Sequence, residues 1–555
     1  MKPIAMILLL SCFWQGWSQQ NSEDTERLYF HVNISNAQTL IITEKKDNTI
    51  AVLSMASDRE TQIYASHKIF RFKKAYPNTK RDLLKTVYTI STDNPELLGS
   101  LQYNFPDKYT RVGQFFTTEN AYYPNDYGTT SPVENLGAPY PAYDLDMIMA
   151  PEAWGITRGN SQVIVGISDA KIDSLDPDFK GRIRNYLKYS NATKGLKCAH
   201  GSSVAAIAVA TMDNGYGRAG ICSNCDVIAN GYGNFNDIEQ LVAAGAKVIN
   251  ASWAKCTMGG KYKENIQERI KEMYDDGIII VAGAGNGTDC NKDGKKLGDS
   301  LYPASFERVI SVSGVYTINR ETTDQVFEHE GRNLTKQVKD RRAGYFYVSD
   351  QGTLTPTEIE KGVQMNKAVD LVAPREGYLL GHDICGEKTL YGGASSSAAP
   401  VVTGIIGLMW SVNYCLSSYE VESILKLSSK GVENLTGNEP YKGLMGAGRV
   451  NAYRAVKMSE QMKDPLATVG ISNRDFYRFD FTLSSAQNSI EIKNQTFRED
   501  ATVDFKAKNQ IILKPGTYLK PNTNGFIKLA IDPNISPKQC SPSPIKKYAS
   551  YKEDN

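Results

Sequence analysis

Three consecutive serines stand at the start of an apolar segment late in the chain. Residues 392–400 read Gly-Gly-Ala-Ser-Ser-Ser-Ala-Ala-Pro, and residues 401–410 are almost wholly apolar. An apolar helix of this kind must be buried, and a proline is tolerated in its first turn, where N–H groups have no partner within the helix. A serine at that end could act as a nucleophile, because the free N–H groups and the helix dipole stabilise nearby negative charge. The same pattern also fits a helix cap without a catalytic role, and by itself it does not distinguish Ser395, Ser396 and Ser397.

A base, an acid and an amide donor are found elsewhere in the chain. His200 opens a run of small residues, which predicts a helix that packs closely against a sheet. Asp169 directly follows 163–168, and Asn286 ends 277–286; both segments carry the short β-branched runs of buried parallel strands. The carboxyl ends of such strands meet at one edge of an open α/β sheet. These positions predict that His200 takes a proton from a serine, Asp169 orients His200, and Asn286 donates to an oxyanion.

Together these segments resemble the signatures of the subtilisin-like serine peptidases, the subtilases. The aspartate signature is matched by 169–179, the histidine signature by 200–205, the oxyanion segment by 284–287 and the serine signature by 396–400. Weaker matches occur at 248–253, 302–304, 369–374 and 446–451. The order Asp, His, Ser is that of subtilisin and differs from that of chymotrypsin-like and α/β-hydrolase enzymes. The resemblance extends from about residue 120 to about residue 460.

Two motifs depart from the family pattern, and the departures bear on the geometry of their loops. Ser203 stands where the histidine motif usually has a second histidine. Ala394 and Ser395 stand where the serine motif usually begins with Gly-Thr. Alignment on 398–400 selects Ser396 as the nucleophile.

The resemblance implies a peptide-hydrolysing reaction. His200 would accept the proton of Ser396 as the hydroxyl attacks a peptide carbonyl, and water would then hydrolyse the acyl-enzyme. The Asn286 side chain and the Ser396 backbone N–H would receive the oxyanion. No cofactor is required for this chemistry. Asp178 matches a position that often binds calcium in subtilases, but the sequence does not identify a partner loop.

The resemblance also indicates where a substrate would lie. Two backbone segments are expected to clasp a peptide as an added strand: Ser252, Trp253 and Ala254, and Ala282, Gly283 and Ala284. Such strand addition reads mostly main chain, so a broad or apolar side-chain preference is expected. Leu301 is expected at the base of the primary pocket, and ordinary core packing is the alternative for both Trp253 and Leu301.

The amino terminus predicts export. Lys2 is followed by a short apolar run, and Ser18 ends a small-x-small cleavage site, so residues 1–18 are expected to be a secretory signal rather than a transmembrane helix. The alternative is a lipid anchor at Cys12, because 9–12 resembles a lipobox. A net charge of +2 over 555 residues, with 22% charged residues, argues against a nucleic-acid or membrane-surface partner.

Export makes disulfides an expectation for the eight cysteines that remain after residue 18. Cys256 and Cys290 are expected to pair, because they follow Ser252 and Asn286 by four residues on segments that are neighbours in the subtilase fold. Cys222 and Cys225 have the spacing of half a zinc site, but no second pair or nearby histidine completes it. A structural role is favoured for them.

The chain divides into five segments on pattern and resemblance. The fold expected for 119–462 is α/β, a subtilisin-like doubly wound parallel sheet. Residues 19–118 are expected to be an α+β propeptide that inhibits the enzyme and keeps it a zymogen; a permanent accessory domain is the alternative. Residues 463–538 carry short alternating runs typical of a small β module, and 539–555 are polar and are expected to be a disordered tail. A charged insertion at 318–366 could modify substrate access or be a solvated insertion, and the solvated insertion is favoured.

Two classes of function fit this organisation. The first is a secreted serine endopeptidase acting on proteins or peptides, with an esterase as a variant. The second is a catalytically idle protein of the same fold that binds through its C-terminal module. The four catalytic positions hold the required residue types, so the peptidase is favoured.

Overall fold

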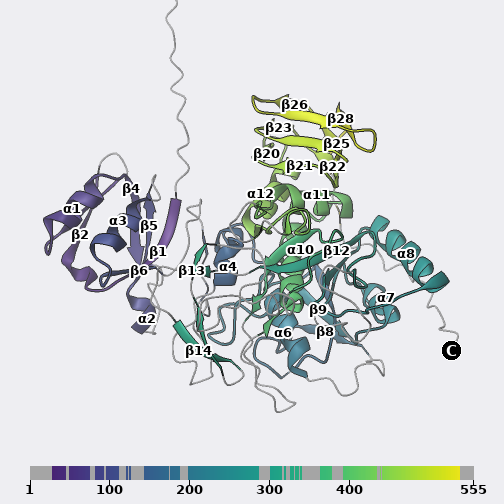
Figure 1. Cartoon of the computed structure of the whole chain (residues 1–555), viewed down its shortest axis with the longest axis horizontal. Helices are drawn as coiled ribbons and strands as arrows, with labels where there is room; N and C mark the ends of the chain where they lie inside the picture. The colour runs from purple at the N-terminus through teal and green to yellow at the C-terminus, as the bar shows by residue number, and fades with distance from the viewer. Residues whose placement is uncertain are drawn as a thin grey trace, which may run out of the picture.

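The computed structural model of the chain has an N-terminal domain, a layered α/β body and a C-terminal β module (Figure 1). The residues that it describes are 28–45, 49–74, 82–92, 96–111, 121–122, 124, 126, 143–173, 175–187, 198–286, 300–315, 318–319, 325–329, 332–336, 338–340, 363–377, 392–433, 438, 441–537 and 540. The predicted signal sequence, the lipid-anchor alternative at Cys12 and the predicted tail beyond 540 lie outside these residues.

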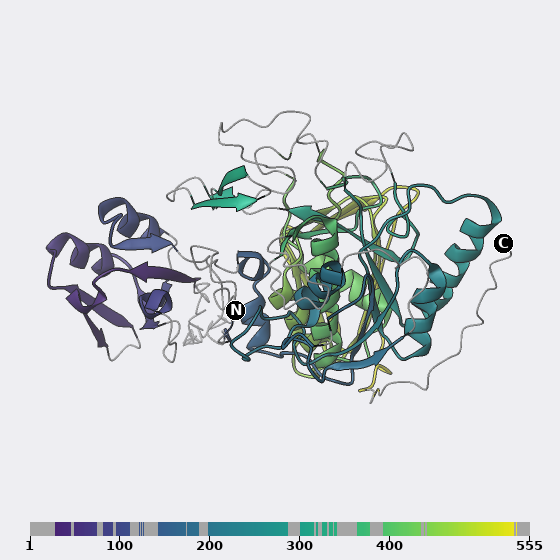
Figure 2. The same ribbon diagram turned by 90° about the horizontal axis from the view of Figure 1, so that it is seen from below.

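The N-terminal domain is α+β, as the sequence predicts. Its antiparallel sheet has the strand order β2-β3-β4-β5-β1-β6. β1, α1, β4, β5, α3 and β6 form a split βαββαβ arrangement, and the hairpin β2–β3 extends the sheet beyond β4. The elements are β1 Leu28–Ile34, β2 Leu40–Glu44, β3 Ile50–Ser54, α1 Asp58–Ala65, β4 Ile69–Lys74, α2 Asp82–Lys85, β5 Val87–Thr92, α3 Glu96–Asn104 and β6 Tyr109–Arg111. The domain has a hydrophobic core of its own, and both views show it beside the α/β body (Figures 1 and 2).

The α/β body is built on a seven-stranded parallel sheet in the order β17-β12-β11-β10-β7-β9-β8. Its strands are β7 Ile164–Ser168, β8 Ile183–Tyr186, β9 Asp226–Asn230, β10 Val248–Ala251, β11 Ile279–Gly283, β12 Val309–Val315 and β17 Leu371–Pro374. The helices are α4 Tyr143–Met147, α5 Ala150–Trp154, α6 Cys198–Val209, α7 Phe235–Ala243, α8 Gly260–Asp275, α10 Ser395–Val412, α11 Ser418–Ser428 and α12 Ala452–Lys463. Short strands fall at β13 Ile318–Asn319, β14 Gln325–His329, β15 Arg332–Lys336, β16 Val338–Asp340, β18 Glu376–Gly377 and β19 Gly392–Gly393.

Helices cover both faces of this sheet. α6 and α10 share one hydrophobic core with the sheet, and α7 and α8 share another. Val227 and Ile228, adjacent in β9, belong to opposite cores, because successive side chains of a strand point to opposite faces. The predicted doubly wound α/β fold is confirmed.

The strand order reverses at β7, with β9 and β8 on one side and β10 through β17 on the other. In open α/β sheets, ligands bind outside the carboxyl ends of the strands at this point of reversal. The predicted acid and substrate-binding residues follow β7 and β10, so the topology brings their backbones to that position.

Helix α10 begins one turn earlier than the sequence analysis assumed. It starts at Ser395, which places Pro400 inside the helix rather than in its first turn. Among the described residues, α10 is the one helix long and apolar enough to cross a membrane, and 83% of it is buried in the core. Its apolar character therefore serves the packing of the sheet.

The predicted C-terminal β module is a parallel β-helix of three coils. Its strands are β20 Thr468–Ser472, β21 Asp475–Phe476 and β22 Asp480–Ala486; β23 Ser489–Lys493, β24 Thr496–Glu499 and β25 Thr502–Ala507; and β26 Gln510–Leu513, β27 Tyr518–Pro521 and β28 Phe526–Ile531. They form three parallel sheets, β20-β23-β26, β21-β24-β27 and β22-β25-β28. The sequence predicted short strands here but not their winding.

The β-helix is packed onto the α/β body rather than tethered to it. Phe481 belongs to the same hydrophobic core as α10. The buried Glu420 of α11 accepts hydrogen bonds from the Ser484 backbone N–H at 2.9 Å and from the Ser485 hydroxyl at 2.7 Å. A disulfide between Cys415 and Cys540 closes the module onto the end of α10.

Candidate active site

Asp169 and His200 are in direct contact. Asp169 follows the last residue of β7, and His200 lies in the first turn of α6. The His200 Nδ1 lies 2.6 Å from the Asp169 Oδ1. Gly201 permits this approach, since a Cβ at that position would lie 2.0 Å from the Ala170 carbonyl oxygen. The glycine that follows the histidine in the motif is therefore a steric requirement.

The environment of the pair suits a base and its orienting acid. The Asp169 side chain is buried, whereas 45% of the His200 side chain is exposed. The Asp169 carboxylate raises the pKa of His200 above its ordinary value, because it stabilises the imidazolium. Asp169 Oδ1 also accepts a hydrogen bond from the Ala170 N–H at 2.6 Å. A carboxylate held in this way can fix the tautomer of the imidazole.

Exposure separates the three serines at the start of α10. Ser395 and Ser397 are buried, with 2% and 7% of their surface exposed, and Ser396 is half-buried. Since a nucleophile must reach its substrate, this difference favours Ser396, the residue that the family alignment selects. Its backbone N–H lies in the first turn of α10, where N–H groups have no partner in the helix.

Pro400 accounts for how Ser396 is held. A proline lacks the N–H that would donate to the carbonyl four residues earlier, so it leaves the Ser396 carbonyl without its helical partner. The Ser252 hydroxyl donates to that carbonyl at 2.9 Å. In return, the Ser396 Oγ donates to the Ser252 carbonyl at 3.3 Å. The carbonyl freed by the interior proline therefore links α10 to the segment that follows β10.

The hydrogen bond of the Ser396 hydroxyl is directed to Ser252 rather than to His200. Within the described residues, the structure joins His200 to Asp169 and Ser396 to Ser252, and no hydrogen bond joins the two pairs. Catalytic hydrogen bonds are often long before substrate binds and tighten in the complex.

Asn286 lies against the start of α10, as expected for an oxyanion donor. Its Oδ1 accepts hydrogen bonds from the Ser395 N–H at 3.1 Å and from the Ser395 Oγ at 3.2 Å. Because the amide oxygen is held by these donors, the amide NH₂ group of Asn286 is directed away from Ser395. The Gly285 N–H donates to the same Ser395 Oγ at 3.2 Å. Ser395 was not predicted to have this role, although the sequence showed that it occupies the usual threonine position of the motif.

The predicted substrate segments flank this region. Ala282, Gly283 and Ala284 are buried at the end of β11, and Trp253 and Ala254 are half-buried after β10. Leu301 is 1% exposed and packs against Gly285. A Cβ at Gly285, which has φ of 102°, would lie 2.2 Å from the Leu301 Cδ1. Core packing, the alternative reading, is part of the role of Leu301.

A second pair of hydrogen bonds, which was not predicted, links the segment after β10 to the ends of β7 and β9. The Trp253 indole N–H donates to the Ser168 Oγ at 3.0 Å, and the Ser168 hydroxyl donates to the Gly231 carbonyl at 2.7 Å. Ser168 is buried and directly precedes Asp169. The bonds therefore connect the ends of β7, β9 and β10 next to the acid. The one polar side chain of an otherwise apolar strand, that of Ser168, is the feature of the sequence that could have predicted these hydrogen bonds.

Comparison with known proteins decides the family. A model of the subtilase family matches residues 160–448, which is more than half of the chain and contains all four predicted catalytic positions. The chain belongs to the subtilase family.

Individual relatives of this subtilase are distant. It is 27% identical over 316 residues to a thermophilic serine proteinase of Bacillus sp. (strain AK1), covering 55% of this chain and 64% of that protein. It is 25% identical over 328 residues to thermitase of Thermoactinomyces vulgaris, covering 57% of this chain and 95% of that protein. A calcium-dependent protease of Trichormus variabilis is 24% identical over 387 residues, covering 64% of this chain and 55% of that protein.

Asp178 of this subtilase lies beside a second buried carboxylate, Asp126. The Asn214 side-chain amide donates to Asp178 at 2.8 Å, and the Asn214 N–H donates to Asp126 at 3.4 Å. Burial raises the pKa of Asp178 to about 8 and the pKa of Asp126 to about 6. The negative charges of nearby carboxylates act in the same direction on both pKa values. Within the described residues, the Asp126 Oδ1 is buried without a hydrogen-bond partner. Asn214 therefore contacts both buried carboxylates.

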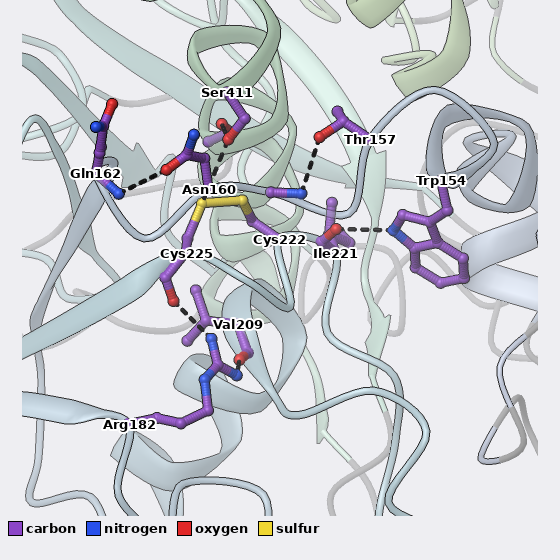
Figure 3. The surroundings of a disulfide bond; sticks show 12 residues. Trp154, Thr157, Asn160, Gln162, Arg182, Val209, Ile221, Cys222, Cys225 and Ser411 are labelled. Carbon is purple, nitrogen blue, oxygen red and sulfur yellow. Dashed lines mark hydrogen bonds between the residues drawn. A yellow bond between two sulfur atoms is a disulfide. The ribbon is translucent and has the colours of Figure 1, made fainter. Parts of the chain in front are cut away.

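Two of the predicted cysteine roles can be compared with the structure. Cys222 and Cys225 form a buried disulfide with each other (Figure 3). The described residues contain no group of three or more His, Cys, Asp or Glu side chains placed to hold a metal ion. The Arg182 guanidinium donates to the Cys225 carbonyl at 2.5 Å and also to the carbonyl of Val209, the last residue of α6, so it links the disulfide loop to α6 (Figure 3). Cys256 is disulfide-bonded, and its predicted partner Cys290 lies outside the described residues.

Proposed function

We propose that this subtilase is a secreted serine endopeptidase that uses Asp169, His200 and Ser396. The observation that carries the proposal is the 2.6 Å contact between His200 and the buried Asp169. The half-exposed Ser396 at the start of α10 supports it, since neither neighbouring serine is accessible.

The mechanism follows from the chemistry of these groups. A neutral hydroxyl is a weak nucleophile, so His200 accepts the Ser396 proton as the oxygen attacks the peptide carbonyl. Asp169 stabilises the imidazolium that forms. The Asn286 amide and the Ser396 N–H donate to the oxyanion of the tetrahedral intermediate. His200 then gives its proton to the leaving amine, and water hydrolyses the acyl-enzyme with His200 again as base.

Substitution of neighbouring serines tests this assignment. Ser396→Ala should lower kcat for an unfolded protein substrate by a factor of about 10⁴ or more, whereas Ser397→Ala should retain most activity. Thermal unfolding of both variants checks that they remain folded. Retention of activity by Ser396→Ala would contradict the proposal. Parallel assays on a peptide and its matched ester distinguish a peptidase from an esterase.

The substrate is proposed to bind as a strand between two backbone segments. Residues 252–254 leave the sheet after β10, just before Lys255 forms an antiparallel bridge with Tyr302. Residues 282–284 end β11 on the other side. Recognition through the main chain implies a broad preference, and Leu301 favours an apolar side chain in the primary pocket. A peptide library with one varied position would show this preference as higher kcat/KM for apolar residues.

We infer that the N-terminal domain is a propeptide and that the chain is exported through a signal at residues 1–18. A hydrophobic core separate from that of the α/β body supports a domain that can be removed without exposing the peptidase core. Mass spectrometry of the secreted protein should find a mature amino terminus between about residues 105 and 125. An uncleaved active protein would support the accessory-domain alternative.

Calcium is proposed as a structural ion at Asp126 and Asp178. Two buried carboxylates suit a hard cation that prefers oxygen ligands, and one of their oxygens has no hydrogen-bond partner among the described residues. Backbone carbonyls would supply the further ligands. The bound ion would neutralise the buried charge and hold the loop around Asn214, which lies at the end of α6 remote from His200.

A further inference from the structure

Within the part of the chain that the structure describes, the last coil of the β-helix leaves its hydrophobic interior partly exposed. Inward-facing residues stack in columns from coil to coil, and in the first two coils they are buried. In one column, Ile471, Ile492 and Leu513 are paired in register and are 1%, 0% and 51% exposed. Ile531, at the end of another column, is 59% exposed. The third coil therefore presents the apolar cross-section that a further coil would bury.

The backbone of this coil is open as well. β26, β27 and β28 are the last strands of their three parallel sheets, and within the described residues no strand pairs with their outer edges. They contain 4, 4 and 6 residues. Figure 1 shows β26 and β28 at the end of the module farthest from α11 and α12. An edge of this kind is a template for an added strand.

The charges at this end select the partner. Lys514, Lys520 and Lys528 lie on or next to the three edge strands and are exposed. The strands themselves contain no Asp or Glu, and Asp532, directly after β28, is the one acidic residue in 510–532. Lys514 lies 3.7 Å from Glu491 of the coil beneath, and Lys528 lies 3.4 Å from Asp504. A carboxylate on a strand added to the outer edge of the third coil would lie near these lysines, as Glu491 and Asp504 of the second coil do.

We propose that the open end of the β-helix is a docking surface for an extended acidic polypeptide segment whose aliphatic and carboxylate side chains alternate. The aliphatic side chains would cover the columns that end at Leu513 and Ile531. The carboxylates would pair with the lysines, and the main chain would bond to an open strand edge. A second copy of this chain is disfavoured, because its lysines would face Lys514, Lys520 and Lys528. This proposal is independent of the peptidase assignment.

Binding of synthetic peptides to the full-length chain tests the proposal. The Ser396→Ala variant is used so that no probe is cut, and binding is followed by fluorescence polarisation. The acidic probe is the labelled peptide Glu-Ile-Glu-Leu-Glu-Val-Glu, and the basic control has Lys at each Glu. The acidic probe should bind at least about tenfold more tightly, with an advantage that falls as salt rises. Absence of binding, or equal binding of the two probes, would overturn the proposal.

Charge reversal locates the site. Lys514→Glu, Lys520→Glu and Lys528→Glu together should weaken the acidic probe at least tenfold. The matched control reverses three exposed lysines on the α/β body, Lys180, Lys261 and Lys442, and should leave binding unchanged. An equal loss in both triple variants would refute the location. Sedimentation velocity should find a monomer, and a dimer dissociated by Leu513→Glu would show that a second copy occupies this end instead.

Discussion

Replacement of Asn286 by alanine should remove the side-chain donor to the oxyanion and leave the rest of the site in place. The Asn286 amide oxygen accepts hydrogen bonds from the Ser395 N–H at 3.1 Å and from the Ser395 Oγ at 3.2 Å. Ser395 therefore fixes the orientation of the amide through its oxygen and does not contact its NH₂ group. Loss of one such donor costs about 3 kcal/mol of the barrier, or roughly a hundredfold or more in kcat. KM should change little, since this interaction strengthens only as the oxyanion forms.

Steady-state kinetics on a chromogenic peptide measure this effect. Ser395→Ala serves as the matched control, because it keeps the backbone donor and removes one neutral hydrogen bond to the same amide, worth about 1 kcal/mol or about fivefold in kcat. Asn286→Ala must also retain the thermal unfolding temperature of the parent protein to within a few degrees. A folded Asn286→Ala enzyme with full kcat, or one that changes only KM, would refute the oxyanion assignment.

Three further outcomes are expected. Because Asp169 raises the pKa of His200 and only neutral His200 accepts a proton, the acidic limb of kcat/KM should have its midpoint above the ordinary histidine value of 6.5 and should move to lower pH in Asp169→Asn; a midpoint below 6.5 in the parent enzyme would contradict this. Addition of calcium to chelator-treated protein should raise the thermal unfolding temperature, and Asp178→Asn should largely abolish the increase; an equal increase in both proteins would place the ion elsewhere. Cys540→Ser should lower the free energy of unfolding by about 2–4 kcal/mol, because it opens a loop of 125 residues closed through Cys415, and an unchanged denaturation midpoint would show that the β-helix is held by packing alone.

Local pattern was sufficient to predict the sheet and the residues at its edge. Asp169 and Asn286 follow apolar runs that are buried strands, and His200 opens a helix of small residues, so side-chain type and spacing located them without a structure. The contact of His200 with Asp169 depends on Gly201, which the motif also contains. These features are local, and a single sequence carries them.

Features that depend on packing between distant segments were missed. Pro400 was expected in a first turn, but it lies inside the helix and leaves the Ser396 carbonyl without a helical partner. The hydroxyl that donates to this carbonyl belongs to Ser252, which lies 144 residues before Ser396. The pairing of Cys415 with Cys540 follows from the return of the chain after the last coil. Residue spacing along the chain does not predict contacts between segments as distant as these.

The sequence of the C-terminal module contains a signal of its winding. Ile471, Ile492 and Leu513 recur at intervals of 21 residues and occupy one column of the β-helix. Alternation within each strand predicted β structure, and only the repeat across coils distinguishes a β-helix from a hairpin module.

Covalent labelling of the full-length protein by a serine-directed phosphonate, with the modified residue located by mass spectrometry, tests the account most directly. The account predicts one modified serine, Ser396, and loss of labelling in His200→Ala. Labelling of Ser395 or Ser397 instead, or labelling of Ser396 that persists without His200, would contradict it.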